Sequence, residues 1–93
     1  MYSLVFDSRV INQQLYTAIE ELIKIYSFQR TYKILNLTKT QLTWLFQFSD
    51  TKDFSNLQEL FNLFHKKKIE ISELKLKRAV LLILAYHKKI ITF

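Results

Sequence analysis

Neither glycine nor proline occurs anywhere in the 93 residues of this chain. These two residues are the strongest local markers of turns, so the ends of helices and strands have to be placed from capping side chains and from Asn. Their absence also excludes Gly-rich phosphate-binding loops of the Walker or the dinucleotide type. Segment boundaries in this chain therefore depend on capping signals.

The composition indicates one small folded domain spanning residues 1–93. Apolar residues make up 49% of the chain, with 8 Phe and 5 Tyr, which favours a packed core over disorder. With no Cys, disulfides and thiolate metal sites are excluded. The longest apolar run, residues 79–86, is far shorter than the roughly 20 residues of a membrane span. The N-terminus does not resemble a secretory signal. We expect a cytoplasmic protein that uses no cofactor and no metal.

Helical periodicity dominates the chain and predicts a mainly α fold with about five helices. Each predicted helix begins near a residue suited to capping. The expected helices are residues 10–26, residues 27–35 capped by Ser27, residues 38–48 capped by Thr38, a fourth helix after a capping box of Ser55 and Gln58, and residues 73–89 capped by Ser72. Residues 2–6 are expected to be an extended lead-in or a small edge strand, and Ile69-Glu70-Ile71 alternates as a strand would. The aromatic residues between 44 and 64 are spaced as inward-facing core positions.

The stretch from Ser27 to Thr43 can form a helix, a tight turn and a second helix, the shape of a DNA-binding helix-turn-helix. Asn36 takes the turn position usually given to Gly, and Thr38 with Gln41 makes a capping box at the start of the second helix. Three leucines are placed to lock the two helices together: Leu35, Leu37 and Leu42.

Positive charge is concentrated in the second half of the chain. The net charge is +6; residues 1–50 hold five Lys or Arg against four acids, and residues 51–93 hold nine against four. Such a basic surface favours a polyanion such as nucleic acid, although an anionic membrane or an acidic protein would also be attracted.

The last predicted helix carries two apolar stripes, so one can pack on its own domain while the other requires a second cover. A second copy of the chain would supply that cover in a two-fold dimer. Alternatively, residues 2–6 and 90–93 of the same chain would cover the second stripe. The predicted dimer interface consists of Leu76, Val80, Ile83, Leu84 and His87.

Several local signatures resemble the N-terminal winged helix-turn-helix domain of LysR-type transcriptional regulators, over about residues 11–89. The similar residues are Ser27, Phe28 and Arg30, then Leu35, Leu37, Thr38, Leu42 and Thr43, then Leu60-Phe61, Ile69 with Ile71, and Ser72-Glu73. The resemblance implies a minimal β wing at about residues 65–71 and a C-terminal dimerisation helix at about residues 73–89. It also implies a stand-alone DNA-binding module that lacks the family's effector domain, so no small-molecule effector is expected.

In a helix-turn-helix the start of the second helix faces base edges in the major groove. Lys39 can donate to guanine, and Thr can contact a base or the thymine methyl group. Gln41 can recognise adenine, although the capping box would hold it inward. Arg30 would reach a phosphate or pair with Glu20 or Glu21. The predicted DNA contacts are Arg30, Thr38, Lys39, Thr40, Gln41, Thr43, Lys66, Lys67 and Lys68.

The leading hypothesis is a small transcriptional regulator that binds double-stranded DNA as a homodimer through the helix 38–48. The alternative is a helical-bundle protein-interaction module without DNA binding, an inhibitor whose general form resembles the basic four-helix bacteriocin-immunity proteins. Under that alternative, the exposed Thr, Lys and Gln are simply a solvated helix face. A membrane-surface binder using Lys66–Lys68 is a third possibility. His65 and His87 have no catalytic constellation near them in the sequence, so an enzyme is not expected.

Overall fold

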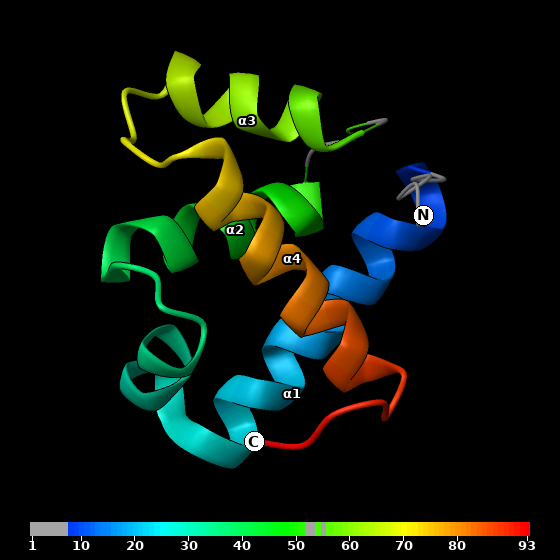
Figure 1. Ribbon diagram of the computed structural model, residues 1–93. Helices are drawn as coiled ribbons and strands as arrows, with labels where there is room; N and C mark the ends of the chain where they lie inside the picture. The colour runs from blue at the N-terminus through cyan, green and yellow to red at the C-terminus, as the bar shows by residue number, and fades with distance from the viewer. Residues whose placement is uncertain (1–7, 52–53, 55) are drawn as a thin grey trace.

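The computed structural model describes residues 8–51, 54 and 56–93, and it leaves the side chains of residues 8–11 and 51 undescribed. Four helices lie in these residues: α1 (Ser8–Ile34), α2 (Lys39–Thr51), α3 (Leu57–Lys66) and α4 (Glu73–His87). α1 packs against both α2 and α4, while α3 lies at the end of the molecule away from the C-terminus (Figure 1). The predicted mainly α fold is confirmed. The possible strand at residues 2–6 falls outside the described residues.

The predicted β wing is not formed in the described part of the chain, which contains no strand. The segment between α3 and α4 is a connection in which Ile69 and Ile71 are buried while Glu70 is exposed. The alternation of buried and exposed residues is therefore present, but without a strand. The two buried isoleucines attach the connection to the core. No described segment pairs with it as a second strand.

A sharp break divides α1 at Ser27, where the backbone adopts φ 73 and ψ 161. This region of backbone space is almost restricted to glycine, which the chain lacks. Contacts around the break hold it in place: the backbone N–H of Arg30 donates to Ser27 Oγ at 3.4 Å, and the buried Thr31 hydroxyl donates to the Ser27 carbonyl at 2.7 Å. The predicted boundary at Ser27 is thus confirmed: two helical segments meet at a kink within α1, and Ser27 Oγ accepts the Arg30 N–H as the predicted cap.

The turn after α1 is closed by Asn36, whose φ of 55 places it in the left-handed region. The N–H of Asn36 donates to the Lys33 carbonyl at 3.1 Å, and the N–H of Leu37 donates to the Tyr32 carbonyl at 2.8 Å. This pair of bonds is the Schellman pattern that ends many helices, usually with glycine at the left-handed position. The leucines predicted to lock the turn are buried: Leu35, Leu37 and Leu42.

Capping side chains begin the remaining helices. The predicted box at α2 is confirmed: Thr38 N–H donates to Gln41 Oε1 at 3.0 Å, and Gln41 N–H donates to Thr38 Oγ1 at 3.1 Å. Ser72 caps α4 as predicted, accepting from the Lys75 N–H at 3.1 Å. At α3, however, the cap is Asn56, which accepts from the Glu59 N–H at 2.8 Å. Ser55, the predicted cap, lies outside the described residues.

Most of the residues predicted to form a dimer interface instead belong to the hydrophobic core of the chain. Leu76, Val80 and Ile83 are fully buried, and Leu84 is 6% exposed. His87 is half-buried and lines a hollow with Gln13, Gln14 and Thr17 of α1. The prediction of this interface is therefore wrong for the folded chain, because α1 covers the stripe that was assigned to a second copy. Within the described residues, no helix is long and apolar enough to cross a membrane.

Candidate nucleic-acid interface

The first turn of α2 presents the residues predicted to contact bases. Thr38, Lys39 and Thr40 are exposed. Thr43 is half-buried, and its hydroxyl donates to the Lys39 carbonyl at 2.8 Å. The hydroxyl of Thr43 is therefore already bonded within the helix, which leaves its methyl group as the part suited to an apolar contact. The exposed polar surface lies at the beginning of α2, where a helix-turn-helix protein meets DNA.

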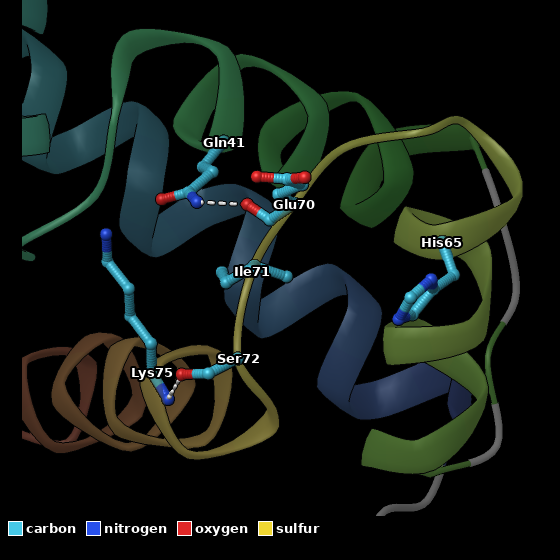
Figure 2. A pocket seen from close by; sticks show the side chains of 6 residues that line it. All are labelled: Gln41, His65, Glu70, Ile71, Ser72 and Lys75. Carbon is cyan, nitrogen blue, oxygen red and sulfur yellow. Dashed lines mark hydrogen bonds between the residues drawn. The ribbon is translucent and has the colours of Figure 1, made fainter.

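Gln41 points inward and is only 5% exposed. Its Oε1 accepts from Thr38, and its Nε2 donates to the Glu70 carbonyl at 2.6 Å (Figure 2). With both ends of its amide bonded to the protein, Gln41 does not belong among the DNA contacts. It ties the connection between α3 and α4 to the start of α2.

Of the basic residues that follow one another at the end of α3, Lys67 lies beside α2. Lys66, Lys67 and Lys68 are exposed, and Lys68, two residues after the end of α3, lies in the left-handed region with φ 59. The Lys67 ammonium lies 5.9 Å from the centre of the Trp44 ring, which packs at a tilt on Phe48 with ring centres 5.6 Å apart. The fold thus brings Lys67 of the predicted phosphate-binding stretch next to Trp44 of α2.

Two basic residues that no sequence pattern singled out, Lys75 and Arg78, also lie near the start of α2 and the turn before it. Lys75 lines a shallow pocket with Gln41 and Glu70, and Figure 2 shows its side chain extending from α4 toward Gln41. Arg78 lines a neighbouring pocket with Asn36 of the turn. These placements depend on how α4 packs, so no local sequence signal identifies them. The capping signal of Ser72 fixes only where α4 begins.

Arg30 lies away from the basic residues at the end of α3. Its guanidinium carbon lies 5.2 Å from the centre of the Tyr26 ring, and the Tyr26 hydroxyl donates to the carbonyl of Phe93 at 2.8 Å. Arg30 therefore lies toward the C-terminus of the chain, whereas α3 lies at the other end (Figure 1). Neither suggested pairing, with Glu20 or with Glu21, occurs among the described residues; Glu20 pairs with Lys24 at 3.6 Å.

No group of three or more His, Asp or Glu residues suited to a metal ion occurs in the described part of the chain. His65 packs edge-on against Phe61 with ring centres 4.9 Å apart. The structure thus presents an exposed, basic and polar surface at the start of α2. Comparisons with protein-family models, with curated proteins and with solved structures found no match to this chain.

Proposed function

We propose that this protein binds double-stranded DNA, with the first turns of α2 in the major groove. The observation that supports the proposal is the exposed sequence Thr38-Lys39-Thr40 at the start of α2, held by a reciprocal capping box and bordered by Lys67 and Lys75. A rigid, polar helix start surrounded by positive charge matches the way a helix-turn-helix meets base edges and phosphates.

The proposed roles follow from side-chain chemistry. Lys39 would donate to guanine O6 or N7, and Thr40 would hydrogen-bond a base edge. The methyl group of Thr43 would contact thymine, because the Thr43 hydroxyl is bonded to the Lys39 carbonyl. Lys66, Lys67 and Lys68 would bind phosphates, which positions the domain without recognising sequence.

Transcriptional regulation as a cytoplasmic homodimer is part of the same proposal. Because Leu76, Val80 and Ile83 are buried, a dimer of this fold would have to use another surface. On α4 the apolar residues left exposed are Leu74 and Leu81, which are two helical turns apart and share one face. Pairing through them would allow two copies of α2 to meet DNA together.

The proposal is tested by selecting bound sequences from a pool of random duplexes, followed by binding titrations with the selected duplex. The variant Lys39→Ala with Thr40→Ala should weaken binding to the selected site by about tenfold or more and reduce its preference over unrelated duplexes. The matched control is Lys24→Ala with Thr17→Ala, which removes the same two residue types from exposed positions on α1 and should leave binding unchanged. A folded wild-type protein that binds no duplex at about 50 mM salt would refute the proposal.

The alternative, a protein-interaction module of the inhibitor or immunity type, is favoured by a separate observation: Leu74 is 58% and Leu81 is 39% exposed on the outer face of α4. Leucines exposed on one face of a helix are typical of a binding surface. Leu74→Gln with Leu81→Gln, which adds no charge, should abolish binding to a protein partner. It would also break a dimer paired through these leucines, but each separate copy of α2 should still bind duplex DNA. A chain that binds no DNA and loses a partner in this variant would belong to the second class.

A further inference from the structure

The start of α4 lies beside both parts of the helix-turn-helix. Lys75 shares one shallow pocket of about 400 Å³ with Gln41 of α2, and it shares a second of about 230 Å³ with Asn36 of the turn. Arg78 also lines the second pocket. Lys75 and Arg78 are three residues apart in a helix, so their side chains leave the same face of α4. Two basic side chains from a distant part of the sequence therefore face the unit proposed to bind DNA.

These two side chains are available for a ligand. Arg78 is exposed and Lys75 is half-buried, and neither forms an ion pair with an acid among the described residues. A guanidinium binds a phosphate through two parallel hydrogen bonds, and an ammonium binds it as a point charge. Glu70 lines the first pocket with Lys75; its backbone carbonyl is bonded to Gln41 and its side chain is exposed. The chemistry and exposure of Lys75 and Arg78 suit them to phosphate groups.

We propose that Lys75 and Arg78 bind phosphates of the DNA strand that borders the groove occupied by α2. This inference rests on the proposed function and adds a second phosphate-binding surface to it, supplied by α4. With Lys67 contacting Trp44 and Lys75 lying beside Gln41, basic side chains border α2 from the end of α3 and from α4. Phosphate contacts from two elements fix the orientation of the helix on the duplex, which a single contact cannot do.

The salt dependence of binding measures such contacts directly, because each neutralised phosphate contributes about 0.9 to the slope of log K against log salt. We would titrate a duplex of about 24 base pairs, a little over two turns, at several salt concentrations. Lys75→Gln with Arg78→Gln should lower the magnitude of the slope by about 1.8, and Arg78→Gln alone should lower it by about 0.9. Helicity and thermal midpoint, measured by circular dichroism, would verify that each variant is folded.

The matched control is Lys24→Gln with Lys88→Gln, which removes the same amount of charge from two exposed positions. Lys88 lies ten residues beyond Arg78, about 15 Å further along the helix axis, and so beyond the screening distance of about 10 Å. The control should keep the wild-type slope. Wild-type protein that binds no duplex would defeat the proposed function itself. If the wild-type protein binds but the Lys75 and Arg78 variant keeps the same salt slope, this inference alone is overturned. An equally large fall in the salt slope of the control would also overturn it.

Discussion

Replacing Gln41 with Ala tests whether one buried amide holds the start of α2 to the connection before α4. The change removes two hydrogen bonds, from Thr38 N–H to Oε1 at 3.0 Å and from Nε2 to the Glu70 carbonyl at 2.6 Å. Each contributes about 1 kcal/mol net, and a backbone group left without a partner raises the loss, so we expect about 2–3 kcal/mol. In a domain of this size that lowers the thermal midpoint by about 10–20 °C.

The measurement is thermal and urea unfolding followed by circular dichroism. Gln58→Ala is the matched control, because Gln58 is exposed and, among the described residues, its amide donates to Asn62 Oδ1 at 3.2 Å within α3. It should cost no more than about 0.5 kcal/mol. Gln41→Glu keeps an acceptor for Thr38 but replaces the donor to Glu70 with a carboxylate oxygen. It should cost at least about 1 kcal/mol, because the lost bond is joined by repulsion between two acceptors. Equal stabilities for the Gln41 and Gln58 variants would refute the reasoning.

Three further changes test other parts of the fold. Lys68→Gly should stabilise the protein by about 0.5–1 kcal/mol in urea unfolding, because a left-handed non-glycine residue costs more than glycine's extra chain entropy; a destabilised variant would contradict the φ of 59. Ile83→Ala should cost about 2–5 kcal/mol and Leu81→Ala less than about 1, since Ile83 is fully buried and Leu81 is 39% exposed; similar losses would argue against this packing of α4. Burial, and then the nearby Glu21 and Tyr26, raise the pKa of Tyr86, so the unfolded chain loses this proton first and stability should fall above about pH 10. Tyr86→Phe should flatten that fall, and an unaltered profile of thermal midpoint against pH would exclude the effect.

Features set by neighbouring residues were predictable from the sequence. The capping box of Thr38 with Gln41 and the cap at Ser72 join residues three positions apart, and the hydrogen bonds occur as the pattern predicts. The turn at Asn36 was predictable for the same reason, since the left-handed position after a helix favours Asn when Gly is absent. Local geometry largely determines such features, whatever the rest of the chain does.

Features set by packing between distant segments were not predictable in the same way. α4 has apolar residues on two faces, and only the position of α1 decides that Val80 and Ile83 are covered while Leu81 is not. The alternation at Ile69 and Ile71 correctly indicated two buried side chains, but a strand also requires a partner strand. The approach of Lys75 to Gln41 likewise appears only once α4 is placed.

The break at Ser27 has a consequence for how a protein of this kind can diverge. Residues before the break lie against α4, as Glu21 does beside Tyr86, whereas residues after it lead through the turn at Asn36 into α2. Two torsion angles of one exposed residue therefore set the direction of the helix pair relative to the rest of the domain. A substitution at Ser27 in a related sequence would change the direction of α2. Every exposed residue at the start of α2 would stay the same. Binding specificity would then change through residue 27, which lies outside the proposed binding surface.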